Sequence, residues 1–177
     1  MMTRQECFKL VDELKMTQEK QMLFPLEIDE KLMLTEEGLK QMHQVLGGTG
    51  KYRTGSLTVE PIGIMPPEAS ELERLMGHFI SQLQISKQMF HPIEYATICH
   101  KRILELYPFE DKNEEVAFLV LNILLSQAGL KPVRMSDNQK GEYIKLLRAA
   151  QHPSHPDIDS LITFIARYEV EMFQNMK

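Results

Sequence analysis

The chain has 177 residues, enough for one compact domain with a hydrophobic core, because typical domains contain about 100 to 200 residues. Its 20 basic and 25 acidic residues give a net charge of -5, and no short window is densely basic, so we expect no nucleic-acid partner. Two isolated cysteines exclude a disulfide framework and favour a reducing compartment.

The N-terminal residues are charged and amphipathic, without the apolar stretch and cleavage site of a signal peptide. The longest apolar run, Val116 to Leu125, is about half as long as a membrane span requires. We therefore expect no membrane partner and a cytoplasmic location. A secreted effector that uses another kind of export signal stays open as an alternative.

Helical periodicity dominates the chain from its first residues to its last. It predicts helices at about 3–21, 35–46, 68–90, 92–106, 116–128, 138–150 and 157–174. Residues 116–128 are apolar on nearly every side and are followed by Gly129, which predicts a central helix buried on all faces. The glycines, prolines and alternating Leu57 and Val59 of residues 47–67 predict a short β-hairpin. The expected fold is an all-α bundle around this buried helix, with one hairpin.

Four carboxylates stand directly before the apolar helix: Glu110, Asp111, Glu114 and Glu115. A helix N-terminus carries unpaired N–H groups and partial positive charge, so it is a suitable place for a phosphate. Alternatively, Asp111 and Glu114 have the spacing of a capping box, in which their own side chains bind those N–H groups. The segment has no glycine that would let a ligand approach the backbone, so the residues themselves favour a capped helix.

The segment from His91 to Val133 resembles the core of the Fic (Fido) domain family, in which a helix leads into a loop of pattern HPFx(D/E)GNGRxxR and then into a buried helix. GKYRTGSLTV from Gly50 is similar to the flap of that family, and the later helices are similar to its closing helices. The resemblance implies one Fic-like domain over residues 1–177. Its parts are N-terminal helices at 1–48, the flap at 50–67, and core helices at 68–177 that enclose a loop at 107–115.

The resemblance also implies roles for single residues. In family members the loop histidine is the general base, the acidic residue holds Mg²⁺, the GNG backbone forms an anion hole, and two arginines bind nucleotide phosphates. The corresponding residues here are Tyr107 for the base, Asp111 for the metal, Lys112, Asn113 and Glu114 for GNG, and Glu115 and Phe118 for the arginines. Mg²⁺ and ATP or another nucleotide are expected as cofactors only if the chain is active.

The residues that differ from the family pattern affect the catalytic activity that we expect. A tyrosine with a pKa of about 10 is a poor general base at neutral pH. Glutamate in place of arginine removes a phosphate clamp and adds a like charge. We therefore expect an inactive or attenuated relative of the protein adenylyltransferases, which transfer AMP to a target hydroxyl. His100 is expected to be a core histidine, with assistance to Tyr107 as a minor alternative.

Without transfer chemistry, the expected action is binding of a protein target or regulatory partner. The flap residues Gly55, Ser56, Leu57, Thr58 and Val59 are expected to pair with an extended segment through their main chain, although a hairpin that only covers the core explains them equally well.

The alternative function is an atypical transferase of a phosphate-containing group that uses Asp111 with Mg²⁺ and Lys112. A kinase of the related Doc branch ranks last, because basic residues follow the loop asparagine in that branch. The oligomeric state is left open.

Overall fold

The computed structural model describes residues 2–16, 34–57 and 65–175. Within these residues the fold is all-α, as predicted, and no strand occurs. Its helices are α1 (Arg4–Met16), α3 (Glu36–Val45), α4 (Leu72–Ser86), α5 (Pro92–Leu106), α6 (Asn113–Gln127), α7 (Asp137–Ala150) and α8 (Ile158–Gln174), with a 3-10 helix (Ala69–Glu71) before α4.

Local signals set most helix ends where the sequence predicted them. α5 begins with a proline at its first position, and the Nδ1 atom of His91 accepts a hydrogen bond from the backbone N–H of Ile93 at 3.2 Å. α6 is followed by Gly129 at φ 76°, a left-handed conformation that glycine adopts without strain. Asp157 caps α8 by accepting from the backbone N–H of Ser160 at 3.1 Å.

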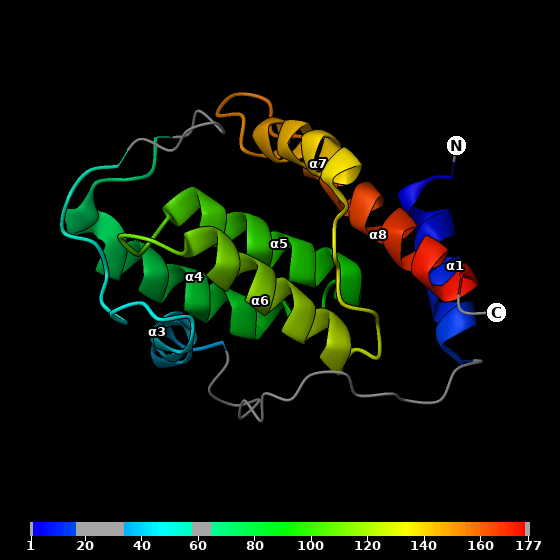
Figure 1. The fold of residues 1–177 in the computed structure, drawn as a ribbon, viewed down its shortest axis with the longest axis horizontal. Coiled ribbons are helices and arrows are strands. Elements are labelled where there is room, and N and C mark those ends of the chain that lie inside the picture. Colours follow the sequence, from blue (N-terminus) through cyan, green and yellow to red (C-terminus); the bar gives the residue numbers. More distant parts are fainter. Residues whose placement is uncertain (1, 17–33, 58–64, 176–177) are drawn as a thin grey trace.

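Helix α6 lies at the centre of the bundle, against α5 on one side, with α3, α4 and α8 packed against the pair (Figure 1). The inner face of α6 is fully buried, for example at Val116, Val120 and Leu121. Each such side chain contributes about 1.5–3 kcal/mol of transfer free energy. The prediction that this helix is buried on every face is wrong, because Phe118 and Asn122 on its outer face are only half-buried.

The described part of the flap, residues 50–57 and 65–67, forms no regular secondary structure. Residues 58–64 lie outside the described residues, and with them Thr58 and Val59. The hairpin prediction is therefore not met in the described part and stays a prediction for the remainder. The predicted first helix is described as α1 as far as Met16, and residues 17–33 also lie outside the described part.

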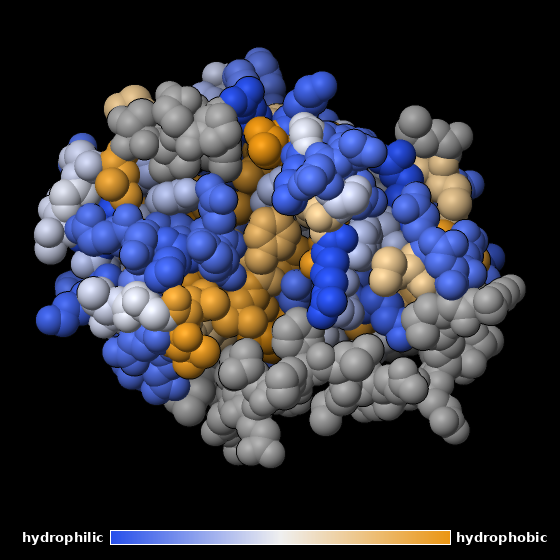
Figure 2. Space-filling model, viewed as in Figure 1, coloured by the Kyte–Doolittle hydropathy of each residue, from blue (hydrophilic) through white to orange (hydrophobic). Residues whose placement is uncertain are grey.

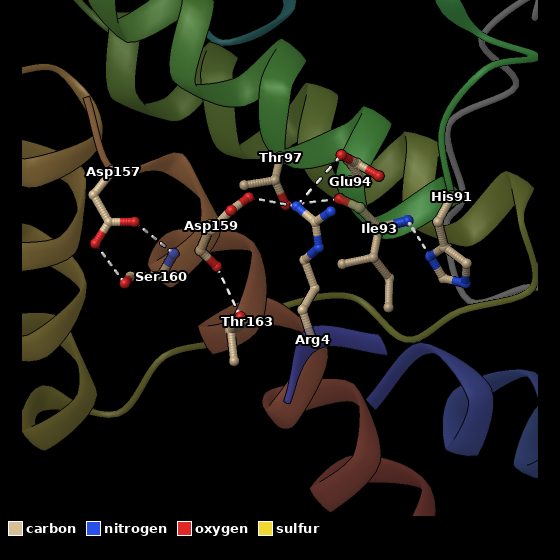
Figure 3. A network of polar contacts seen from close by, with 9 residues as sticks. All are labelled: Arg4, His91, Ile93, Glu94, Thr97, Asp157, Asp159, Ser160 and Thr163. Atoms are coloured by element: carbon tan, nitrogen blue, oxygen red, sulfur yellow. Dashed lines mark hydrogen bonds and ion pairs between the residues drawn. The ribbon is translucent and has the colours of Figure 1, made fainter. Parts of the chain in front are cut away.

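Helix α1 packs alongside α8, and a polar network fixes it at the start of α5 (Figures 1 and 3). Arg4 forms ion pairs with Glu94 of α5 and Asp159 of α8. The ring of Phe8 stacks on that of His91, with centroids 3.9 Å apart. α1 thus ties the first turn of α5 to the first turn of α8, on the side of the bundle away from the loop 107–112.

Candidate functional site

The loop between α5 and α6 turns sharply at two residues with left-handed backbone, Tyr107 at φ 44° and Lys112 at φ 54°. This conformation costs a residue with a Cβ atom roughly 1–2 kcal/mol. Lys112 stands where the family pattern has glycine, so the loop keeps a glycine-like backbone at a position that no longer holds one. The surrounding contacts must therefore hold the loop in this shape.

Asn113, the first residue of α6, supplies one such contact. Its side chain is 1% exposed. Its Oδ1 atom accepts from the backbone N–H of Phe109 and its Nδ2 atom donates to the carbonyl of Phe109, both at 2.9 Å. The amide thus closes the loop onto itself as a backbone pair would. Its hydrogen bonds serve the loop backbone, so the described contacts give Asn113 a structural role at the position of the family's anion-hole asparagine.

The capping-box prediction for Asp111 and Glu114 is wrong. Lys112 is the N-cap residue of α6, and its side chain makes no capping hydrogen bond. Asp111 instead accepts from His43 of α3, and Glu114 accepts from the hydroxyl of Tyr107 at 3.1 Å. Lys112, with its positive φ, directs the chain into the helix without a side-chain cap. Asp111 and Glu114 therefore make contacts across the loop.

His43 is a site residue that the sequence analysis missed. It is 1% exposed and its ring stacks on Phe109, with centroids 4.0 Å apart. Its Nδ1 atom accepts from the backbone N–H of Gly50 at 3.0 Å, so the Nε2 atom carries the proton and donates to Asp111 at 2.9 Å. One neutral imidazole therefore links α3, the flap and the loop. Its place on the buried stripe of α3 beside Leu39 was the available signal.

Arg53 makes the second link between the flap and the loop, and it was also missed. Its side chain is buried, at 2% exposed. Its guanidinium donates to the carbonyls of Tyr107 (2.8 Å), Gly55 (2.8 Å), Leu106 (3.5 Å) and Pro67. Two of these carbonyls belong to the C-terminal end of α5, where the helix dipole favours a cation.

Backbone contacts extend the same link. The N–H of Arg53 donates to the carbonyl of Pro108 at 2.9 Å, and the N–H of Thr54 donates to Oε1 of Glu110 at 3.0 Å. Glu110 and Asp111 therefore both contact the base of the flap, Asp111 through His43. These contacts with the base of the flap explain their place before α6.

The residue at the base position, Tyr107, is held in its protonated form. Burial, together with the negative charge of Glu114, raises the pKa of the Tyr107 hydroxyl above its ordinary value. His100 does not assist it. Its Nε2 atom is hydrogen-bonded to the hydroxyl of Tyr143 at 2.6 Å, and burial lowers the pKa of His100 to about 4. His100 is thus a neutral core histidine, as the sequence analysis favoured.

The described residues do not form a magnesium site. No group of three or more His, Cys, Asp or Glu side chains converges among them. The Asp111 side chain is 64% exposed, and its Oδ1 atom already accepts a hydrogen bond from His43. Mg²⁺ in nucleotide sites is bound by one or two carboxylates and by substrate phosphates. Asp111 supplies one carboxylate, while Glu114 and Glu115 oppose the phosphates, so the donor set does not fit the ion.

The two positions that carry arginine in the family pattern differ in their surroundings. Glu115 is exposed. Phe118 packs its ring against His100 and Tyr143, with centroids 4.7 and 5.3 Å apart. The approach to the start of α6 is therefore acidic, and the wall beyond it is aromatic. No described side chain on this wall takes over the phosphate-binding role of an arginine.

In the flap, the described candidates are Gly55, Ser56 and Leu57. The carbonyl of Gly55 accepts from Arg53, and the hydroxyl of Ser56 donates to Glu68 at 3.0 Å. Leu57 is half-buried. The base of the flap is thus anchored to the core, and whether its edge pairs with another chain stays a prediction.

The fold is a helical domain in which a strained loop leads into a buried helix. A polar segment is hydrogen-bonded across that loop, which is the candidate ligand-binding loop at one end of the domain. The comparisons identify this class. The family model described as the Fic/DOC family matches residues 33–125. The chain therefore belongs to the Fic/DOC family.

Curated relatives include the protein adenylyltransferase Fic of Aedes aegypti, 35% identical over 119 residues, and that of Nematostella vectensis, 34% identical over 120 residues. These alignments cover 66% and 67% of this chain but only 23% and 27% of the relatives. The chain thus spans about a quarter of their length.

Solved structures agree on the fold. A Fic family protein from Desulfovibrio desulfuricans G20 superposes with a TM-score of 0.69 at 20% identity, covering 96% of this chain and 51% of that one. Fic-1 from C. elegans gives 0.69 at 19% identity, covering 99% and 52%. None of the described helices has the length and apolar character needed to cross a bilayer.

Proposed function

We propose that this chain is a Fic-type domain in which AMP transfer to a target hydroxyl is lost or strongly attenuated, and that it acts by binding a protein partner through the flap and the neighbouring cleft. The adenylyltransferase relatives supply the reaction class from which it departs. The observation that carries the proposal is the hydrogen bond from Tyr107 to Glu114, which places an anion 3.1 Å from the hydroxyl at the base position.

The hydrogen bond from Tyr107 to Glu114 disfavours both proton abstraction by Tyr107 and the binding of a nucleotide phosphate. A general base must accept a proton, but the Tyr107 hydroxyl points its proton at a carboxylate that stabilises the protonated form. A phosphate at the start of α6 would also lie close to Glu114. Two like unit charges about 4 Å apart repel by roughly 1 kcal/mol in water and about 4 kcal/mol near a protein surface. Glu115 on the same turn adds to this repulsion.

The alternative, an atypical transferase of a phosphate-containing group, needs Mg²⁺ at Asp111 and a phosphate at Lys112. The exposure of Asp111 is the one observation in its favour. It requires Mg²⁺-dependent binding of a phosphorylated ligand that Asp111→Ala abolishes. A non-catalytic domain requires no such binding.

Thermal unfolding with ATP, with and without Mg²⁺, separates the two. The wild type is compared with a variant in which the family loop is restored by five substitutions: Tyr107→His, Lys112→Gly, Glu114→Gly, Glu115→Arg and Phe118→Arg. A ligand at about 100 times its Kd stabilises by roughly 2.7 kcal/mol, or about 5 to 10 °C for a chain of this size. We expect that shift in the restored variant and none in the wild type. A Mg²⁺-dependent shift in the wild type would overturn the proposal.

The binding half of the proposal is tested at the flap. A photo-crosslinking residue at position 57 captures the partner, and its affinity is then measured with purified proteins. Leu57→Pro removes one main-chain donor, so we expect it to weaken binding by about tenfold if the flap pairs as a strand. Ser56→Ala, which leaves every main-chain donor in place, is the matched control. Equal affinity of Leu57→Pro and wild type would contradict pairing through the flap.

A further inference from the structure

A cavity of about 360 Å³ lies between α6 and α7, beside the loop. Leu104 of α5 contributes to its lining, and so do Val133 and Met135 of the segment that joins α6 to α7. Figure 2 shows hydrophobic surface in the middle of this face, where α6 lies in Figure 1, with hydrophilic side chains around it. Pockets for small ligands typically measure about 300–1,000 Å³, so the cavity is large enough for one.

The lining of the cavity is mainly apolar. Phe118 and Ile144 form facing walls on α6 and α7, and Leu147 and Leu104 lie deeper. Phe118 and Tyr143 also present aromatic rings, whose centroids are 5.3 Å apart. The free energy decreases when an apolar group replaces water at such a surface.

The polar side chains in the lining already have protein partners. The Asn122 amide accepts from the N–H of Val133 at 2.7 Å and donates to its carbonyl at 3.2 Å. The Tyr143 hydroxyl is paired with His100, and Lys140 donates to Asp137 at 2.8 Å. A ligand therefore need not supply hydrogen bonds in order to enter, and an apolar one leaves no polar group newly unpaired.

The charged side chains at the rim of the cavity discriminate between ligands by charge. Glu114 lines the cavity on the loop side, and its Oε1 atom accepts from Tyr107. Of the two charged side chains in the lining, Lys140 is paired with Asp137, whereas Glu114 has no ion-pair partner among the described residues, so the loop side of the rim repels anions and tolerates neutral or cationic groups.

We propose that this cavity binds a small apolar ligand, aromatic or aliphatic, that carries no negative charge. Phe118 supplies the apolar wall, and Glu114 excludes anions. This inference rests on the proposed function, because it gives the cleft a ligand other than a nucleotide. It names a ligand class for the cleft and adds no reaction.

Two fluorescent dyes that share one aromatic body test the proposal. Phenylnaphthylamine is uncharged, and anilinonaphthalene sulfonate carries the same rings with a negative charge. We expect saturable one-to-one binding of the neutral dye to the wild-type chain and binding of the sulfonate weaker by about tenfold. The chain has no tryptophan, so the dye signal is measured without that background. Absence of saturable binding of the neutral dye, or equal binding of both dyes, would overturn the proposal.

Variants locate the site. Ile144→Trp fills the cavity and should weaken the neutral dye by at least about tenfold. Ile85→Trp adds the same side chain at a position on α4 that is 75% exposed and should leave the affinity unchanged. Glu114→Lys changes an exposed side chain, so this variant keeps the test valid if Ile144→Trp fails to fold. Glu114→Lys should raise the affinity for the sulfonate to that for the neutral dye. Equal loss in both tryptophan variants, or no change in Glu114→Lys, would place the dye elsewhere.

Competition separates this inference from the proposed function. If ATP with Mg²⁺ displaces the neutral dye, the cavity is real but the chain binds nucleotide, and both the proposed function and the exclusion of anions fail. If the dye does not bind and ATP causes no thermal shift, the inference alone fails. The expected result is bound dye that ATP does not displace.

Discussion

The stability of this protein should fall as the pH rises from 6.5 to 8, because one carboxyl is buried without an adequate partner. Glu169 on α8 is fully buried. Its Oε2 atom accepts from the backbone N–H of Lys131 at 2.9 Å, while its Oε1 atom has no hydrogen-bond partner among the described residues. Burial raises the pKa of Glu169 from 4.5 to about 8.

The sign follows from proton binding. Between pH 4.5 and 8 the folded chain holds a proton on Glu169 that the unfolded chain has released, so stability falls by about 1.4 kcal/mol per pH unit. His100 acts in the opposite direction, because burial lowers its pKa from 6.5 to about 4, and stability is lost as the pH falls through that range. The two effects cancel between pH 4.5 and 6.5. Above pH 6.5 the effect of Glu169 dominates, and because its folded form is half ionised at pH 8, the loss by pH 8 is about 1.5 kcal/mol.

Urea denaturation followed by far-UV circular dichroism at pH 6.5 and pH 8 measures this loss. A loss of that size also lowers the Tm by about 3 to 6 °C. Glu169→Gln should abolish the difference between the two pH values, whatever its own effect on stability. Glu171→Gln removes a carboxylate from an exposed position on the same helix and should leave the difference in place. Equal stability of the wild type at both pH values, or an unchanged difference in Glu169→Gln, would refute the reasoning.

Three further predictions concern the loop, and each is measured as a change in free energy of unfolding by urea denaturation at pH 6.5. Arg53→Met should destabilise by about 3–5 kcal/mol, because it leaves part-buried carbonyls of three segments without their donor; a loss below 1 kcal/mol would contradict the anchoring role. Asn113→Ala should cost about 2–3 kcal/mol, since two buried loop bonds are lost. Lys112→Gly should stabilise by about 0.5–1 kcal/mol through relief of its left-handed backbone, and a destabilisation would show that its side chain contributes more than the strain costs.

The helices were predictable because their signals are local. The proline at position 92, the glycine at 129 and the acid at 157 act on neighbouring backbone groups, so they fix helix ends whatever the rest of the chain does. The buried stripe of each helix likewise follows from spacing alone. The all-α fold was therefore accessible from these local signals, and the family from the resemblance of residues 91–133 to its core.

The partners of the loop acids were not accessible in this way. Asp111 has the spacing of a cap, but its donor, His43, lies 68 positions earlier in the chain. Arg53 reaches the end of α5 across 54 positions. Such contacts depend on the packing of α3 and the flap against α5, which no local pattern encodes. The cap also failed because Lys112 takes a positive φ, a conformation that residues with a Cβ atom rarely adopt.

Contacts within the protein hold the loop in its bent shape. The shape is held by Asn113 and Arg53, whose hydrogen bonds run to backbone groups, and by His43, which is hydrogen-bonded to the backbone of Gly50 and to the carboxylate of Asp111. The positions that face a ligand in the family pattern, such as 107 and 118, carry side chains that the loop does not need for its own closure. Phenylalanine at 118, where the family pattern has an arginine, therefore forms part of the apolar wall of the cavity. The proposed binding of an uncharged apolar molecule uses this wall, beside the acidic residues of the loop.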